Sequence, residues 1–433
     1  MIAAAENIKP GTEWMPNVPE HWQMIRVKNL FKEIDKRSAT GKEDLLSVSQ
    51  YTGVTPRKDS FDEGKEITNA KTLKGYKIVE QNDLVVNIML AWNGCLGISS
   101  YNGITSPAYC VYRVKENYNP EYFGYLFSTS LYKGEFRKQS TGIIESRLRL
   151  YSDAFFRIFC FVPLLKEQDQ IVNLINTQSA KITRFIQTKQ RFIELLKEQR
   201  QSIITNAVTK GIDEKAKMKE TGIEWMPQIP AHWEVRRLRY VGQCQNGINK
   251  GQEYFGSGFP FVGYTYVYKY ETLPSALTGL AISTDEDRIN YSVKQGDVFF
   301  TRTSETAEEI GISSVCMQTI LNATFSGFLI RFRPFDSILH SGFSKYYFRC
   351  NAHRAYFVKE MLIVTRASLS QNLLKNLPVL IPPIKEQKQI EEYINAETKT
   401  LDIAISKAER EIDLIKEYRE AMIAEAVTGK MKL

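Results

Sequence analysis

A long helix occurs twice in this chain, and no other feature restricts its fold as strongly. The first copy runs from about Pro163 to Lys210 and the second from about Pro382 to Lys430. A proline precedes each copy and a glycine follows it, so both boundaries are marked. The matched segments are Lys166-Glu167-Gln168 with Lys385-Glu386-Gln387, Gln170-Ile171 with Gln389-Ile390, Ile175-Asn176 with Ile394-Asn395, and Ala207-Val208-Thr209 with Ala426-Val427-Thr428.

Both copies carry a heptad pattern, in which inward-facing positions alternate in steps of four and three and predict a coiled-coil seam. In the second copy several of these residues are smaller, so the natural partner of one helix is the other. Two similar halves packed about a local twofold axis would make the helices antiparallel. The predicted seam residues are Ile171, Ile175, Gln178, Ile182, Phe185, Lys189, Phe192, Leu196, Gln199 and Ile203, then Ile390, Ile394, Leu401, Ala404, Ala408, Ile415 and Met422.

The remaining composition indicates two globular units and suits a nucleic-acid partner. A chain of 433 residues is too long for one core. Its net charge of +8 comes with 22 tyrosines and 23 phenylalanines, a combination found in nucleic-acid-binding proteins, although many basic proteins bind none.

Cysteine usage and hydropathy indicate a reduced, cytoplasmic protein. Cys95, Cys110, Cys160, Cys244, Cys316 and Cys350 form no C-x-x-C pair and lie mostly among apolar residues. No apolar run is long enough to span a bilayer, and residues 1–10 do not resemble a secretory signal, so we expect neither membrane insertion nor secretion.

A second repeat opens each half of the chain. Glu13-Trp14-Met15-Pro16, Pro19 and His21-Trp22 recur with the same spacing as Glu224-Trp225-Met226-Pro227, Pro230 and His232-Trp233. We favour packing of these rings against a globular unit or a helix end; the alternative is a partner surface formed by Trp14, Trp22, Trp225 and Trp233. His21 and His232 have no repeated cysteine or carboxylate cluster beside them, so we expect structural roles and no metal site.

The stretches from about Arg26 to Val162 and from about Arg237 to Ile381 share a framework of strands and helices. Asn82-Asp83 and Gly296-Asp297 each precede an apolar strand, and both stretches then reach the sequence Gly-Ile-Ser-Ser at residues 97–100 and 311–314. Aromatic-rich helices are expected near residues 122–136 and 343–357. These patterns predict two mixed α/β units.

The polar loops between these strands differ most between the units, and loops on a rigid scaffold commonly carry recognition. Their arginine, lysine, asparagine, glutamine and threonine side chains can pair with base edges and phosphates, although an ordinary solvated turn is the competing interpretation for each one. The DNA-contact candidates are Gln50, Tyr51, Thr52, Arg57, Lys58, Trp92, Asn93, Lys138, Thr141 and Arg147 in the first unit, and Asn249, Lys250, Tyr264, Arg302, Thr303, Ser304, Thr365, Arg366 and Ser368 in the second.

With both repeats in view, the chain resembles the specificity subunit of type I restriction-modification systems along essentially its whole length. The resemblance implies an α+β fold in which two mixed α/β target recognition domains are joined by two long antiparallel coiled-coil helices, with a pseudo-twofold internal repeat. It implies these segments: 1–26, a conserved opening; 27–162, the first recognition domain; 163–212, a long helix; 213–236, the second opening; 237–381, the second recognition domain; and 382–433, the last helix.

The resemblance also implies a function without catalysis. Each recognition domain would read one half of an asymmetric bipartite DNA site, and the helices would set the spacing. Two modification methyltransferase subunits and the restriction-translocase subunits would be partners, with S-adenosylmethionine, ATP and Mg bound on them and no cofactor on this chain.

Catalytic motifs support the same expectation from the residues themselves. Asn119-Pro120-Glu121-Tyr122 lacks the second proline of a base-holding methyltransferase loop, and no P-loop is present. Asp297 and Glu305 lack a following lysine at nuclease spacing, and Asp297 suits a turn before a strand. A stand-alone methyltransferase or nuclease, or a structural coiled-coil protein, are the alternative functions.

Overall fold

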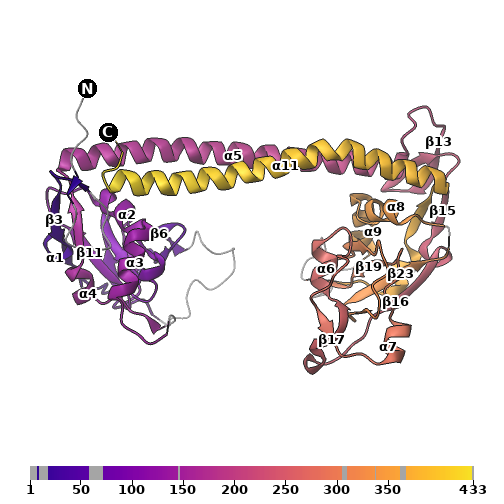
Figure 1. Cartoon of the computed structure of the whole chain (residues 1–433), viewed down its shortest axis with the longest axis horizontal. Helices are drawn as coiled ribbons and strands as arrows, with labels where there is room; N and C mark the ends of the chain where they lie inside the picture. Colours follow the sequence, from indigo (N-terminus) through magenta and orange to yellow (C-terminus); the bar gives the residue numbers. More distant parts are fainter. Residues whose placement is uncertain are drawn as a thin grey trace. The chain divides into compact units, whose positions relative to one another are not determined.

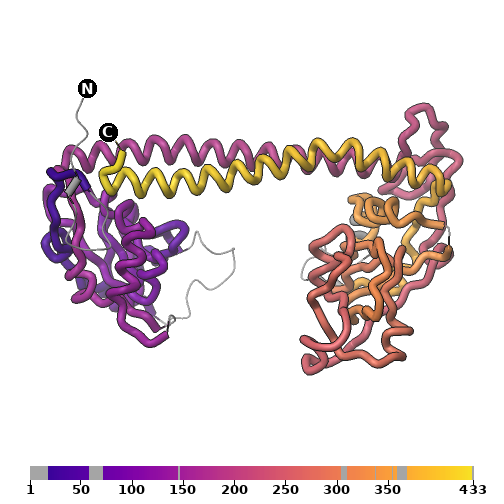
Figure 2. The backbone as a smooth tube through the Cα atoms, viewed as in Figure 1, coloured from indigo at the N-terminus to yellow at the C-terminus, as the bar shows by residue number. Residues whose placement is uncertain are grey.

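The structure is a computed structural model that describes residues 7–8, 18–57, 72–144, 147–304, 310–336, 338–360 and 367–431. The chain divides into two compact units, one made of Met1–Lys189 with Arg410–Leu433 and the other of Gln190–Glu409. Each unit therefore contains one globular part and a stretch of both long helices, as the continuous tube in Figure 2 shows.

The two long helices are α5, Leu165–Lys210, and α11, Ile384–Val427, with 46 and 44 residues. In the first unit, Ile171 and Ile175 near the start of α5 share a core with Met422 and Ala426 near the end of α11. The second unit has the reverse pairing, in which residues 204–208 of α5 pack with Ile390 and Ile394. The predicted antiparallel pairing of one helix with the other is thus observed inside each unit (Figure 1).

Ion pairs follow the same antiparallel pairing along both helices. Lys189 contacts Glu411 at 2.6 Å in the first unit, and Lys197 contacts Glu409 at 3.3 Å in the second. Arg200 pairs with Asp402 at 2.8 Å. Exposed pairs of this kind contribute little stability individually, so burial of the apolar seam holds the helices together.

Some of the predicted seam residues on α5 are buried and others are exposed. Ile171, Ile175, Ile182 and Leu196 are buried, whereas Phe185, Phe192 and Gln199 are exposed. Ile193, one residue after Phe192, faces inward instead. An α-helix has 3.6 residues per turn, so the residues three and four positions after Ile182 both lie on the side of the helix that faces the seam. The aromatic character of Phe185 and Phe192 is therefore not evidence of burial.

The first unit is built on a four-stranded antiparallel sheet in the order β4-β11-β8-β9. The strands are β4 (Phe31–Glu33), β11 (Cys110–Val114), β8 (Asp83–Val86) and β9 (Leu96–Ile98). Helix α2 (Pro120–Ser128) packs on β8 and β9, and α3 (Ser130–Gln139) packs on α2 and α4 (Ser152–Arg157). Strands β3 (Gln23–Arg26) and β12 (Phe159–Val162) pair beside α5, and the hairpin β5 (Leu46–Ser49) with β6 (Gly53–Pro56) lies against β9.

The second unit repeats this order with a sheet β16-β23-β19-β21. Its strands are β16 (Gly242–Asn246), β23 (Leu329–Pro334), β19 (Val298–Thr301) and β21 (Ser313–Val315). The matching helices are α8 (Ser341–Tyr347), α9 (Asn351–Glu360) and α10 (Gln371–Asn376), and β15 (Glu234–Arg237) pairs with β25 (Pro378–Ile381). This unit also contains β17 (Phe255–Val262), β18 (Leu280–Ala281), β22 (Thr324–Phe325), α6 (Tyr264–Lys269) and α7 (Asp285–Asn290). Both units are mixed α/β, as predicted.

Aspartate-arginine pairs hold equivalent strands in the two units. Asp83 accepts hydrogen bonds from Arg113 Nε at 2.8 Å and Nη2 at 3.0 Å, and Asp297 accepts the same pair from Arg333, both at 2.6 Å. Asp297 Oδ2 also accepts the backbone N–H of Lys294 at 2.7 Å, which closes the turn before β19. The structural role predicted for Asp297 is confirmed, and Glu305 lies outside the described residues.

The cysteines are all free, and burial determines their chemistry. Cys95, Cys160, Cys316 and Cys350 are buried, and Cys110 and Cys244 are half-buried. Burial raises the pKa of Cys160 and Cys316 to about 12, so both remain protonated and inert at neutral pH. Among the described residues, no group of three or more His, Cys, Asp or Glu side chains is placed to hold a metal ion, and no helix is apolar and long enough to cross a membrane.

Candidate nucleic-acid interface and helix junctions

The two sequence repeats meet at a junction in each unit. In the second unit, Glu386 in the first turn of α11 accepts a hydrogen bond from Trp233 Nε1 at 3.0 Å and contacts His232 Nε2 at 2.7 Å. In the first unit, Glu167 in the first turn of α5 binds Trp22 Nε1 at 3.0 Å and His21 Nε2 at 2.8 Å. The glutamate of each Lys-Glu-Gln motif therefore binds the histidine-tryptophan pair of its own unit's opening segment.

The far end of the other long helix completes each junction. Gly211, just past the end of α5, lies against the ring of Trp233, and Gly429, past the end of α11, lies against Trp22 and Pro19. Both glycines have φ values in the left-handed region, +76° and +72°, which lets the chain leave the helix without a Cβ penalty. Each long helix thus ends against the indole ring of a repeated opening segment, which explains why Ala-Val-Thr recurs before both glycines.

The glutamine of each Lys-Glu-Gln motif binds the backbone at the start of a shorter helix in the same unit. Gln168 Oε1 accepts the backbone N–H of Asn119 at 2.8 Å, and Gln387 Oε1 accepts that of His340 at 2.7 Å. Asn119 and His340 are the residues that precede α2 and α8. The side chain of Asn119 caps α2, so the Asn119-Pro120-Glu121-Tyr122 string is a helix start and not a base-holding loop.

Burial corrects the assignment of two tryptophans as partner contacts. Trp22 is 5% exposed and Trp233 is fully buried, so both rings pack within their own units, which is the interpretation favoured from the sequence. Trp225 is half-buried, with its ring 5.4 Å from that of Tyr356, and its assignment as a partner contact stays a prediction. Trp14 lies outside the described residues.

Several DNA-contact candidates of the second unit come together around one pocket. The pocket has a volume of about 420 Å³ and lies where β16, β19 and the turn before β23 meet. Four predicted residues, Asn249, Arg302, Thr303 and Ser368, line it although the sequence separates them by up to 119 positions. The lining residues are Asn246, Gly247, Asn249, Arg302, Thr303, Gly327, Phe328 and Ser368.

Short backbone pairings build this pocket. Strand β20 (Thr303–Ser304) pairs with β24 (Ala367–Ser368), and Gly327 donates its N–H to the Ile248 carbonyl at 2.8 Å. A Cβ on Gly247 would lie 2.2 Å from the Ser326 carbonyl oxygen, so only glycine allows these two turns to approach each other. Sequence reasoning missed Asn246 and Phe328, because an asparagine ending a strand and a lone aromatic carry no local signal of a shared pocket.

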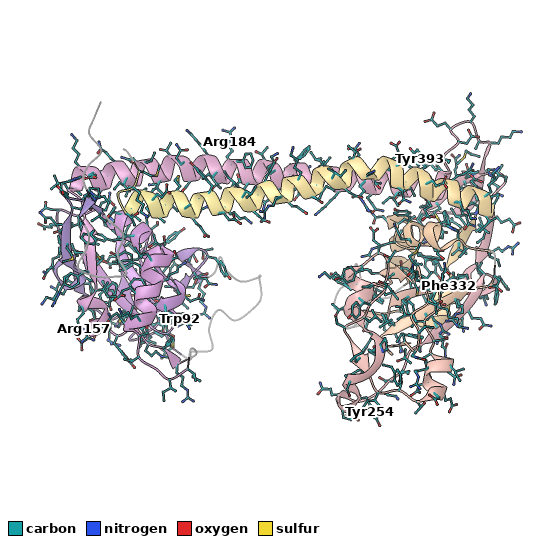
Figure 3. All side chains as sticks on the ribbon, viewed as in Figure 1. Trp92, Arg157, Arg184, Tyr254, Phe332 and Tyr393 are labelled. Carbon is teal, nitrogen blue, oxygen red and sulfur yellow. The ribbon has the colours of Figure 1, made fainter. Side chains whose placement is uncertain are left out.

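The other candidates of the second unit lie elsewhere. Lys250 Nζ pairs with Asp287 at 2.7 Å and lies over the Tyr254 ring, and Tyr264 stacks on Tyr268 with a centroid distance of 6.0 Å. Tyr254 is at the end of this unit that lies away from the helices (Figure 3). Thr365 and Arg366 fall outside the described residues, and only the backbone of Ser304 is described.

In the first unit, the turn between β5 and β6 brings one set of candidates to the sheet. Gln50, Tyr51 and Thr52 form this turn, and Tyr51 is 86% exposed. Gly53 lies against Gly97 of β9, and the Gln50 backbone N–H binds the Cys95 thiol, whose pKa burial raises. The Arg57 backbone is hydrogen-bonded to Leu45 at 2.8 Å, and Lys58 lies outside the described residues.

A second set of candidates gathers around Trp92, which is labelled in Figure 3. Its Nε1 donates to the Met89 carbonyl at 3.1 Å, and the Arg137 guanidinium lies 5.4 Å from its ring centroid. Lys133, also on α3, lies against Gly94 of the same turn. Sequence reasoning missed Arg137 and Lys133, because it searched loops and both cations are on a helix. Exposed Asn93 and Lys138 flank this cluster in the sequence.

The last candidates of the first unit lie in the loop after α3. Thr141 and Arg149 form a two-bond bridge of 3.0 and 2.9 Å, and exposed Arg147 precedes it. Leu150 then donates its N–H to the Ile88 carbonyl at 2.9 Å, just after β8.

Both candidate regions occupy the same place in the shared topology. The bond from Leu150 to Ile88 in the first unit is matched by one from Leu369 to the Arg302 carbonyl at 2.7 Å in the second. In each unit this bond joins the segment after a central sheet strand to the segment that leads into a short helix, α4 or α10. The two units thus present unlike side chains, Trp92 with Arg137 and Arg302 with Asn249, on one scaffold.

Both units combine one scaffold with different polar side chains, and a comparison with protein families finds a match to part of the chain. Residues 230–412 match the family model described as the type I restriction modification DNA specificity domain. This segment includes the second histidine-tryptophan motif, the pocket and the first part of α11. The predicted resemblance to type I specificity subunits is confirmed over this segment.

The chain is similar to particular type I specificity subunits over nearly its whole length. It is 23% identical to the type I restriction enzyme MjaVIII specificity subunit of Methanocaldococcus jannaschii, across 96% of this chain and 94% of that protein. It is 22% identical to the type I restriction enzyme EcoKI specificity subunit of Escherichia coli K12, across 90% of this chain and 83% of that protein.

A solved structure shows that the fold is shared. It is described as the structural basis underlying complex assembly and conformational transition of the type I R-M system. The match has a TM-score of 0.68 at 15% identity and covers 96% of this chain and 99% of the solved chain. The chain is thus similar to type I specificity subunits in sequence and shares its fold with this solved chain.

Proposed function

We propose that this chain reads DNA for a type I restriction-modification complex, with each globular unit recognising one half of an asymmetric bipartite site. The observation that carries the proposal is the equivalent position of the two candidate regions, which combine one topology with different side chains. Base reading requires such side chains on a rigid frame. A site read by two unlike regions would have two unlike halves.

The long helices support a spacing role in this proposal. Helices of 46 and 44 residues would each extend about 65–70 Å at 1.5 Å per residue, which exceeds the 34 Å that separates half-sites one DNA turn apart. The paired helices would therefore be long enough to set the gap between the half-sites.

Catalysis would come from partner subunits in the cytoplasm. We expect two modification methyltransferase subunits with S-adenosylmethionine, and restriction-translocase subunits with ATP and Mg. The absence of a P-loop and of a complete base-holding motif from the sequence supports a role without catalysis. Trp22 and Trp233 are buried within their own units, so the partner subunits would dock on other residues of the junctions and helices.

Exchange of one unit tests the proposal. Residues 27–162 are replaced by the equivalent unit of a related specificity subunit, and the chain is expressed with its methyltransferase subunits. Single-molecule sequencing of host DNA should show a new first half-site, an unchanged second half-site and an unchanged gap. Methylation of the original site by the exchanged chain would contradict the role assigned to this unit.

A further inference from the structure

Arg302 differs from Arg200, Arg333 and Arg349 of the second unit in what holds its guanidinium group. Arg200 and Arg333 pair with carboxylates, and Arg349 is bound by the carbonyls of Tyr268, Tyr270 and Ser313. Arg302 makes one long hydrogen bond, from Nη1 to the Gly327 carbonyl at 3.5 Å, and no carboxylate among the described residues pairs with it. Most of its donors are therefore available to a ligand in the pocket.

The backbone of Arg302 is held more firmly than its side chain. Its N–H donates to the Phe328 carbonyl at 3.0 Å, and its carbonyl accepts from Leu369 at 2.7 Å. The next residue, Thr303, is paired with Ser368 across two short strands. The origin of the side chain is thus fixed between two segments, which lowers the entropic cost of aiming the guanidinium at a ligand.

The pocket around Arg302 has the chemistry of a base-reading site. Its remaining polar side chains, from asparagine, threonine and serine, are uncharged, and Phe328 is 59% exposed beside them. Among the described residues, no carboxylate lines the pocket, so the lining has no acceptor for the exocyclic amine of cytosine. A planar fork of donors matches two adjacent acceptors, and guanine presents that pair, O6 and N7, in the major groove.

We propose that Arg302 reads a guanine in the half-site recognised by the second unit, with the guanidinium donating to O6 and N7. This inference rests on the proposed DNA-reading function and adds the base and the residue that specifies it. Arg302 is a specificity residue here, since the methyl transfer takes place elsewhere.

A phosphate contact is the competing role for the same side chain. A phosphate would bind lysine as well as arginine, and its loss would weaken binding to all sequences alike. A guanine contact made by both prongs of the guanidinium should be weakened by lysine, because a single ammonium group does not reproduce the planar fork. Glutamine pairs with adenine N6 and N7, so Arg302→Gln should shift the preferred base and not merely lower affinity.

The test compares Arg302→Gln, Arg302→Lys and the wild-type chain, each expressed with its methyltransferase subunits. Arg237, exposed on β15, provides a matched control, because Arg237→Gln removes the same charge from the same unit. The methylated motif and the fraction methylated at each site are read by single-molecule sequencing. The unchanged first half-site reports that each variant is folded and assembled.

The wild-type motif is expected to contain a G·C pair in the second half-site. Arg302→Gln should lower methylation rates at that motif by about 5- to 150-fold and relax or change the base at one position, with Arg237→Gln unchanged. An unchanged motif in Arg302→Gln, or a loss that is uniform across sequences and restored by lysine, overturns the guanine assignment alone. A wild-type chain that directs no sequence-specific methylation overturns the proposed function and this inference together.

Discussion

Glu386→Ala tests whether the junction in the second unit is held by the carboxylate that joins helix and tryptophan. Glu386 accepts the Trp233 indole N–H at 3.0 Å, and Trp233 is fully buried. Alanine leaves the indole N–H of this buried ring without its carboxylate partner. A buried donor left unsatisfied costs about 1–3 kcal/mol, and a hydrogen bond to a charged group is at the upper part of that range. We expect the second unit to lose about 2 kcal/mol.

Hydrogen exchange read by mass spectrometry measures this loss locally. A decrease of about 2 kcal/mol should increase exchange roughly 30-fold in peptides that cover β15 and the first turns of α11. A local readout is preferable, because a chain of two units need not unfold in one two-state transition. Glu167→Ala should have the same effect on the matching peptides of the first unit, since its bond to Trp22 is also 3.0 Å.

Two further variants separate the hydrogen bond from other effects of the substitution. Glu392 is exposed on the same helix, so Glu392→Ala removes an equal charge and should leave exchange unchanged. Glu386→Gln keeps a carbonyl acceptor for the indole and should lose less than Glu386→Ala. The reasoning is refuted if Glu386→Ala and Glu392→Ala have equal exchange rates in these peptides.

Two predictions concern the core of the second unit. Asp297→Ala removes both carboxylate bonds to Arg333 and leaves its guanidinium bonded to Ser292. It should lower the free energy of unfolding by about 3 kcal/mol in urea titrations, whereas exposed Asp336→Ala should not. Burial lowers the pKa of His353 to about 3 in the folded chain. Below pH 6.5 the unfolded chain therefore binds one more proton than the folded chain, and the free energy of unfolding decreases as the pH falls from 6.5 towards 3. Between pH 7 and 5 the loss should be about 2 kcal/mol, and His353→Phe should abolish it; an equal pH dependence in both chains would contradict this role.

The buried core illustrates what apolar runs in the sequence can predict. The strands after Asp83 and Asp297 were predicted from their apolar runs, and β8 and β19 are fully buried. Asp297 itself was predicted to be a turn residue before its strand. The bonds from the two aspartates to Arg113 and Arg333 were not predicted, since those arginines are on strands 30 and 36 residues later.

The candidate interface illustrates the limits of loop-based reasoning. Arg302, Thr303, Asn249 and Ser368 were predicted individually, and their common pocket emerged only in the structure. Arg137 was missed because a cation on a helix is ordinarily a solvated residue, and here it lies over the Trp92 ring. Residue type indicates what a side chain can bind, whereas its neighbours decide whether it is free to bind it.

The sequence by itself determined the duplicated architecture and the two long helices, because repeats and heptad patterns can be recognised along the chain without knowledge of the fold. Only the tertiary structure decided which face of α5 is buried around Phe192, why His-Trp and Lys-Glu-Gln recur together, and which loops share a pocket. Those outcomes depend on contacts between residues such as Trp233 and Glu386, 153 positions apart. No local pattern encodes such a contact, since its energy arises only when folding excludes water from both partners.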